Sequence, residues 1–194
     1  MHVQVTTAPA TQAVSDAEAV AHAKIDSDAA TADSALINDL VLSAILWAEQ
    51  YTNRALVTQT ITLTLESDEF TQPFHLPRPP FGAVTSFNVY DEDDAATEIT
   101  SANYRIVGDD PARIEQKADG WSLSRDVAAA IIVYTAGYGA ASAVPEDIKT
   151  AIRMKFTDLY EQRQGILVGA TQSRNALIEE LLMPYRVGHL TAWT

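Results

Sequence analysis

The sequence predicts an α+β fold: a helical bundle of two N-terminal and two C-terminal helices with an inserted small antiparallel β unit. Apolar residues recur at helical spacing before about position 52 and again after about position 145. Between these stretches the period changes to two, as expected for strands with one exposed face. We therefore expect a single domain over 1–186, with the β insertion at about 57–135, and a C-terminal tail at 187–194.

The N-terminal helices are predicted from a capping pattern and from apolar spacing. Residues 1–14 are rich in Thr and Ala and are expected to be extended, with little structure of their own. Ser15 followed by Glu18 fits a capping box that opens a short helix to about Lys24, and the polar residues 26–28 indicate a turn. A longer helix is predicted over 34–52. Its apolar residues are expected to form one broad face: Leu36, Ile37, Leu40, Val41, Ala44, Ile45, Ala48 and Tyr51.

The C-terminal helices begin near Pro145, which suits the first helical position, with Glu146 and Asp147 close to the positive end of the helix dipole. A second helix is predicted from about position 174 to 182, and Pro184 with Gly188 would end it. The buried side of the first of these helices is expected to contain Ile148, Ile152, Phe156, Leu159 and Tyr160.

The β unit is predicted from alternation and from turn residues. The segment 58–65 alternates threonines with apolar residues, which is typical of a half-exposed antiparallel strand. Further strands are expected at 83–90, 104–107, 113–116 and 127–135, with the acidic residues 91–94 at a hairpin tip. The last strand is apolar on both faces, which favours a central or covered position.

Composition excludes several classes of protein. The chain has 194 residues and a net charge of −13, and such a surface repels phosphate, so tight nucleic-acid binding is not expected. The absence of cysteine excludes disulfides and thiolate chemistry. The start of the chain lacks the pattern of a signal peptide, and its longest apolar run, Val127–Tyr134, is too short to span a bilayer, so no membrane association is expected.

No segment has the pattern of a catalytic, cofactor or metal site, and we expect none. The four histidines lie far apart in sequence, and no Gly-x-Ser-x-Gly elbow is present. The acidic run 91–94 lacks the glycine and the distal glutamate of a calcium loop. Gly137 and Gly139 follow an apolar strand, but no helix begins directly after them as a dinucleotide site requires. An active site assembled only by the fold, as in a small acidic hydrolase, remains an alternative.

The run Leu76-Pro77-Arg78-Pro79-Pro80 is the most unusual local feature. Three prolines fix φ and remove backbone donors, so the run is expected to form a stiff extended corner between two strands. Such a corner loses little entropy on binding and would suit a docking element. A plain rigid loop accounts for the same residues equally well.

The C-terminal tail is the second candidate surface, because its aromatic and arginine residues lie beyond a helix stop. The alternative is that the tail folds back onto its own domain. The residues that we expect to contact partners are Pro77, Arg78, Pro79, Pro80, Leu181, Leu182, Pro184, Tyr185, Arg186, Val187, Leu190 and Trp193.

From about Val14 to Arg186 the chain resembles the head–tail connector proteins (adaptor or head-completion proteins) of long-tailed bacteriophages, prophages and gene transfer agents. The order and spacing of several short segments support the resemblance together, although each is weak alone. The segments are 15–19, 48–56, 76–80, 86–91, 134–139, 144–149 and 181–186.

The resemblance implies a helical protein with a β insertion, assembled as a ring, expected to be dodecameric, beneath the portal in the virion neck. Its partners would be the portal protein, neighbouring copies of itself and the next neck or tail-completion protein, and it would be made in the host cytoplasm. Double-stranded DNA would pass through the ring without sequence-specific binding. The C-terminal segment of such proteins docks into the portal, but this chain continues eight residues beyond Arg186. A tail-terminator or tail-completion subunit is the alternative assembly role.

Overall fold

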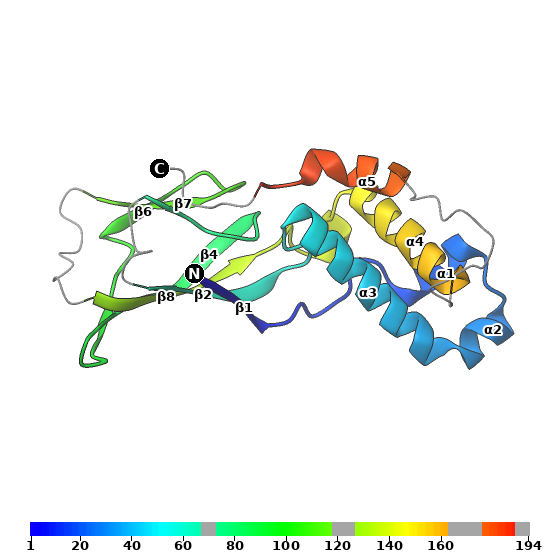
Figure 1. Ribbon diagram of the computed structural model, residues 1–194, viewed down its shortest axis with the longest axis horizontal. Coiled ribbons are helices and arrows are strands. Elements are labelled where there is room, and N and C mark those ends of the chain that lie inside the picture. Colours follow the sequence, from blue (N-terminus) through cyan, green and yellow to red (C-terminus); the bar gives the residue numbers. More distant parts are fainter. Residues whose placement is uncertain (67–72, 118–126, 163–175, 189–194) are drawn as a thin grey trace. The chain divides into compact units, whose positions relative to one another are not determined.

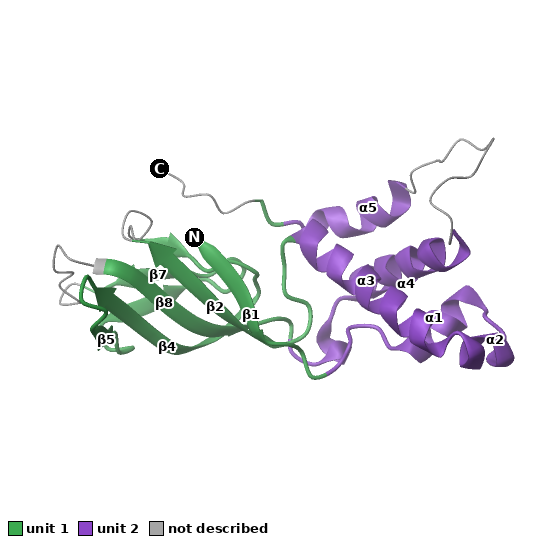
Figure 2. Cartoon of the chain, turned by 60° about the horizontal axis from the view of Figure 1, so that its bottom comes forward, with its two compact units in different colours: residues 1–10, 53–138, 187–194 green, residues 11–52, 139–186 purple. Residues whose placement is uncertain are grey.

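The computed structural model describes residues 1–66, 73–117, 127–162 and 176–188. The chain divides into two compact units (Figure 2). Unit 1 contains residues 1–10, 53–138 and 187–194, and unit 2 contains residues 11–52 and 139–186. The α+β class is confirmed, and the predicted β insertion at about 57–135 makes up most of unit 1.

Figure 1 shows the elements along the chain. The strands of unit 1 are β1 (His2–Thr7), β2 (Gln59–Glu66), β3 (Phe74–His75), β4 (Phe81–Asp91), β5 (Ala96–Glu98), β6 (Tyr104–Val107), β7 (Arg113–Gln116) and β8 (Val127–Ala136). The helices of unit 2 are α1 (Asp16–Ala23), α2 (Ser27–Ala32), α3 (Ser34–Thr52), α4 (Glu146–Glu161) and α5 (Ala176–Leu182). Two 3-10 helices, η1 (Ala141–Ala143) and η2 (Met183–Tyr185), precede α4 and follow α5.

Unit 1 consists of two antiparallel sheets. A five-stranded sheet has the order β1-β2-β8-β4-β5, and a three-stranded sheet has the order β3-β7-β6. β8 is central, as the sequence predicts, and it pairs along most of its length with both β2 and β4. Phe87 of β4 makes edge-to-face contacts with Phe74 and Tyr104 of the smaller sheet, at ring centroid distances of 6.2 and 5.7 Å. Both sheets therefore contribute to one apolar core.

The strand β1 corrects the expectation that residues 1–14 have little structure of their own. β1 pairs antiparallel with β2 from His2↔Thr64 to Thr7↔Thr60 and forms one edge of the larger sheet. Val3 packs against the core of unit 1. The pairing partner lies more than fifty residues away, so the local composition of the segment does not reveal the strand.

The proline corner 76–80 joins β3 to β4 and is hydrogen-bonded to three other parts of unit 1. The peptide bond between Pro79 and Pro80 is cis, and Arg78 has a left-handed φ of 60°. Pro77 and Pro79 are buried, whereas Arg78 and Pro80 are half-buried. The carbonyl oxygens of the corner accept three hydrogen bonds: from Tyr134 Oη to Pro77 at 2.6 Å, from Ala55 N to Pro79 at 3.2 Å, and from Gly137 N to Pro80 at 2.8 Å.

In unit 2, α4 contacts α1, α3 and α5. The side chains that α3, α4 and α5 bury are mainly aliphatic, with Phe156 as the largest. The ring of Phe156 stacks on that of Tyr160 at 5.9 Å, and the Tyr160 hydroxyl donates to Asp33 at 3.0 Å. The predicted capping box is present: Glu18 N donates to Ser15 Oγ at 3.3 Å, and Ser15 N donates to Glu18 at 2.8 Å.

Three helical details differ from the sequence-based expectations. Residues 26–28 do not form a simple turn, because Asp26 is the N-cap of α2 and the alanines that follow favour a helix. The described residues therefore contain three helices before the β insertion and two after it, instead of two and two. Pro145 is the N-cap of α4 and not its first helical residue.

The buried aromatic of α4 gives a direct test of the core of unit 2. We expect Phe156→Ala to lower the free energy of unfolding by about 3–5 kcal/mol, because the residue is fully buried and its loss leaves a cavity. Urea unfolding followed by the helical circular dichroism signal measures this loss. Leu46→Ala, at an exposed position of α3, is the matched control and should change stability by less than about 0.5 kcal/mol.

A second test concerns the hydrogen bond between Tyr134 and the proline corner. Burial raises the pKa of Tyr134 well above its ordinary value of 10.0, so the folded state favours the neutral hydroxyl. This stabilisation is fully present below about pH 10 and is lost as the pH rises above that value. At neutral pH we expect Tyr134→Phe to cost about 1–3 kcal/mol, because the buried carbonyl of Pro77 loses its donor.

The readout is the urea midpoint of both proteins between neutral and strongly alkaline pH. The wild-type chain should lose stability above pH 10 faster than Tyr134→Phe, so that the two curves converge. The other ionisable groups are the same in both proteins, so their contributions to the stability cancel when the two curves are compared. Curves that stay parallel would show that Tyr134 does not ionise on unfolding.

Candidate assembly surfaces

The proline corner offers less surface than its sequence suggests. Of the four corner residues predicted to contact partners, Pro77 and Pro79 are buried within unit 1. Arg78 and Pro80 are half-buried and are the members with side-chain surface to offer. The corner is therefore first an element of the fold, and its role in docking stays a prediction.

The C-terminal segment contains both core and surface residues. Leu182 is fully buried inside unit 2, so its predicted contact with a partner would require the helix to move. Leu181 is half-buried, and Pro184 is exposed. Val187 is half-buried at the start of the tail, whereas Leu190 and Trp193 lie outside the described residues.

Two contacts hold the end of this segment against unit 2. The Tyr185 hydroxyl donates to Asp147 Oδ2 at 3.2 Å, next to the start of α4. The guanidinium of Arg186 lies over the ring of Tyr51, near the end of α3, at 5.4 Å from its centroid. Residues 185 and 186 are thus anchored, and the chain beyond Arg186 leaves a fixed point of unit 2.

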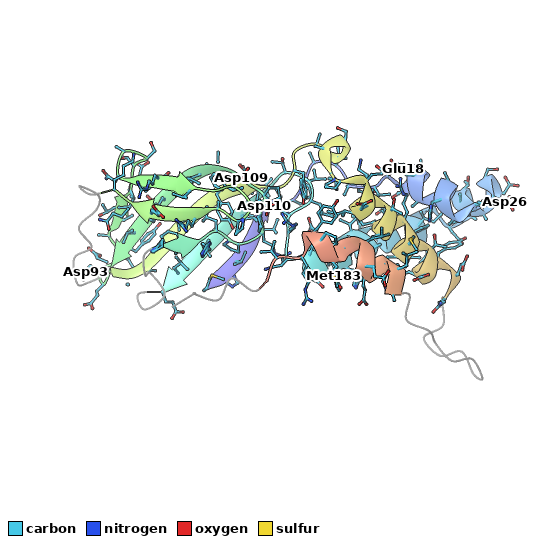
Figure 3. The ribbon with its side chains drawn as sticks, turned by 90° about the horizontal axis from the view of Figure 1, so that it is seen from above. Glu18, Asp26, Asp93, Asp109, Asp110 and Met183 are labelled. Atoms are coloured by element: carbon cyan, nitrogen blue, oxygen red, sulfur yellow. The ribbon has the colours of Figure 1, made fainter. Side chains whose placement is uncertain are left out.

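The structure also exposes large apolar residues of unit 2 that the sequence-based reasoning did not single out. On α3, Leu42 and Leu46 are 47% and 53% exposed, on the opposite side of the helix from its buried residues. Leu177 of α5 is 51% exposed and Met183 of η2 is 65% exposed; Figure 3 labels Met183. A helical wheel of α3 would have revealed the first pair, because both leucines fall outside the stripe of the other apolar residues.

The outer face of the smaller sheet contains a cluster of charged side chains. Arg105 and Arg113 both pair with Glu115, at 2.7 and 2.8 Å. Hydrogen bonding from Arg105, with Arg113 close by, lowers the pKa of Glu115 below its ordinary value. Two cations therefore share one carboxylate, which reduces the positive charge that this face presents to solvent.

The acidic hairpin tip between β4 and β5 is confirmed and has its own turn structure. Asp91 Oδ1 accepts hydrogen bonds from the backbone of Asp93 at 3.0 Å and of Ala95 at 2.8 Å. Asp93 lies at this tip (Figure 3). The carboxylate of Asp91 thus closes the turn, as Asp does in such turns.

Two observations on the described part of the chain bear on catalysis. It contains no group of three or more His, Asp or Glu side chains that could hold a metal ion. An open hollow of about 570 Å³ lies beside the start of α1, and Glu18 is the one ionisable residue among those that line it. Because Glu18 is engaged in the capping box, the hollow has no free acid or base to offer.

Two further features of the sequence find structural explanations. Gly137 and Gly139 have positive φ values of 126° and 115°, and η1 separates them from α4. The two glycines therefore lie in a bend of the chain, and α4 does not begin directly after them. Among the described residues, no helix combines the length and apolar character needed to cross a membrane.

Comparison with known proteins adds a likeness over the whole chain. No protein-family model matches the sequence, and no curated protein matches it. Among solved structures, the chain is similar to one in the virion of a native gene transfer agent particle, with a TM-score of 0.80 and 25% identity. It is also similar to a chain in the neck of an empty gene transfer agent particle, computed with C6 symmetry, with a TM-score of 0.81 and 26% identity.

A third similar chain comes from the neck of a native gene transfer agent particle, computed with C12 symmetry. Its TM-score is 0.77 and its identity 24%, so this likeness concerns the fold alone. Each of the three comparisons covers 98% of this chain and 98% of the other. The chain is therefore similar over nearly its full length to chains in the virion and neck of gene transfer agent particles.

Proposed function

We propose that this chain is a non-catalytic structural subunit of the neck of a phage-like particle. Copies of it form a closed ring beneath the portal, extend the DNA channel and provide the surface on which the next neck or tail component docks. The observation that supports this most strongly is the likeness over 98% of both chains to a neck subunit at 26% identity. A likeness of that extent includes both units and not only one common module.

Local chemistry is consistent with this role. A subunit that lines a DNA channel must not hold the phosphates that pass it, and this chain has 26 acidic against 13 basic residues. Arg105 and Arg113 on the smaller sheet are paired with Glu115, and Arg54 is paired with Asp110 at 2.7 Å. Such local pairing lowers the number of cations that could bind a phosphate backbone.

We further propose that the C-terminal segment is the portal-facing element. Tyr185 and Arg186 fix the point from which the tail departs, through Asp147 and Tyr51. A tail that starts from a fixed point loses less orientational freedom when it binds than one attached through a loose linker. The residues beyond Arg186 include Val187, Leu190 and Trp193, which have the apolar and aromatic character of interface anchors.

The proposal is tested by locating the protein in purified particles and by deleting its gene. Electron microscopy of particles with a tagged chain should place it in a ring between portal and tail. The deletion should give DNA-filled heads that lack tails or that lose their DNA. Cross-linking to tail-tube protein instead of portal would favour a tail-terminator or tail-completion role, and absence of the chain from the neck would refute both.

The portal-facing role of the tail makes a separate prediction. Replacing residues 188–194 by seven glycine and serine residues should leave the circular dichroism spectrum and the thermal midpoint unchanged, because the half-buried Val187 and the anchors Tyr185 and Arg186 are retained. Incorporation of the variant into particles should fall strongly, since the apolar side chains of the tail are lost. Normal incorporation would show that the tail side chains are dispensable for docking.

A further inference from the structure

A ring built from one kind of subunit needs two different surfaces on each copy. Around a cyclic ring with more than two members, one surface of each copy meets a different surface of the next copy. The question is which surfaces of this chain meet. This inference rests on the proposed ring and goes further by naming the two surfaces.

Unit 2 presents two separate apolar surfaces on different helices. The first, which we call the α3 face, consists of Leu42 and Leu46, one helical turn apart and both about half exposed. The second, which we call the α5 stripe, consists of Leu177, Leu181 and Pro184. These three residues follow the i, i+4, i+7 spacing of one helix side, over α5 and its continuation in η2.

Among the described residues of unit 2, the members of these two surfaces do not belong to the buried core. The buried side of α3 contains Ile37, Val41, Ala44, Ala48 and Thr52, and the α3 face lies on the other side of the helix. In α5 the buried residues are Ile178 and Leu182, whereas Leu177 and Pro184 are exposed and Leu181 is half-buried. Of the seven large apolar residues that are exposed in the described part of the chain, five belong to unit 2.

The net charge sets a condition that any contact between copies must meet. Each copy has a net charge of −13, so two copies repel each other unless a desolvated apolar contact outweighs the repulsion. The exposed Asp39 and Glu180 lie three residues from Leu42 and Leu177, so an acidic side chain borders each of the two apolar surfaces. Exposed leucines at helical spacing are what one helix offers to another helix.

We propose that the α3 face of one copy packs against the α5 stripe of the next copy around the ring. This assigns one interface, with two different sides, to the self-association of the chain. In this arrangement Leu181 and Pro184 contact a neighbouring copy, and the tail beyond Arg186 contacts the portal.

Cysteine cross-linking in assembled particles tests this assignment. Because the chain has no natural cysteine, each variant offers a single thiol at a known position. Leu46→Cys and Leu177→Cys chains are produced together in particle-forming cells, and the particles are oxidised. We expect a cross-linked dimer from the mixture and none from either variant alone, because unlike surfaces meet. Leu42→Cys and Pro184→Cys, used in the same way, allow for a shift in register, since a disulfide requires Cα atoms within about 7 Å.

Control variants separate the interface from other causes. A mixture of Leu46→Cys and Ala21→Cys chains, the latter at an exposed site of α1, should give no dimer. Leu46→Glu should leave the unfolding midpoint of the isolated chain unchanged but lower its incorporation into particles by about tenfold or more, because it places a charge in the apolar contact. Ala21→Glu should have no effect on incorporation.

The outcomes distinguish this inference from the proposed function. If microscopy places the chain in a neck ring but none of the mixed pairs forms a dimer, the interface is wrong and the function stands. A dimer from Leu46→Cys alone would mean that like surfaces meet, which also overturns the assignment. A photoreactive benzoylphenylalanine at position 46 identifies what covers the α3 face: α5 peptides of a second copy support the proposal, and portal or tail peptides refute it.

Discussion

The pairing of β2 with β8 is the constraint on which the rest of the structure depends. The first and last long strands of the β insertion lie side by side, with Gln59 opposite Ala136. Tyr138 N, just after β8, donates to Leu56 O, just before β2, at 2.9 Å. The chain therefore leaves unit 1 next to the point at which it entered, and the two helical stretches of unit 2 can close into one body. Gly137 is required here, because its φ is 126° and an added Cβ would lie 2.6 Å from a backbone carbon of the entering segment.

Elements with a strong local period were predictable, and elements that depend on distant partners were not. α3, β6 and β7 have the boundaries that the sequence predicts, because apolar spacing and turn residues define them locally. β1 and the very short β3 and β5 were missed. β1 and β3 exist because strands distant in the sequence supply their hydrogen bonds, whereas β5 pairs with the neighbouring β4 and is only three residues long. α2 was missed because Asp and Ser favour turns and helix starts alike.

Surface residues were harder to predict than elements, because residue type alone does not determine exposure. Pro77 and Pro79 are unusual in sequence, but the fold uses their stiffness and buries them. Leu182 belongs to the same stretch as the exposed Pro184, yet it lies on the inner side of α5. By contrast Leu42 and Leu46 are ordinary leucines in an apolar helix; a helical wheel places them outside the apolar stripe, and the packing of α3 shows that this side is exposed. The helical period determines which side chains share a side of a helix, but tertiary packing determines which side is covered.

The net charge bears on how copies of the chain can associate at all. A ring of copies of this chain, as proposed above, would bring together many negative charges. If ion pairs held the copies together, salt would weaken the ring, because it screens attraction between exposed charges. If apolar surfaces hold them together, salt instead screens the repulsion and strengthens the ring. The contact that we propose between the α3 face and the α5 stripe corresponds to the second case, so we expect salt to strengthen the association of the copies.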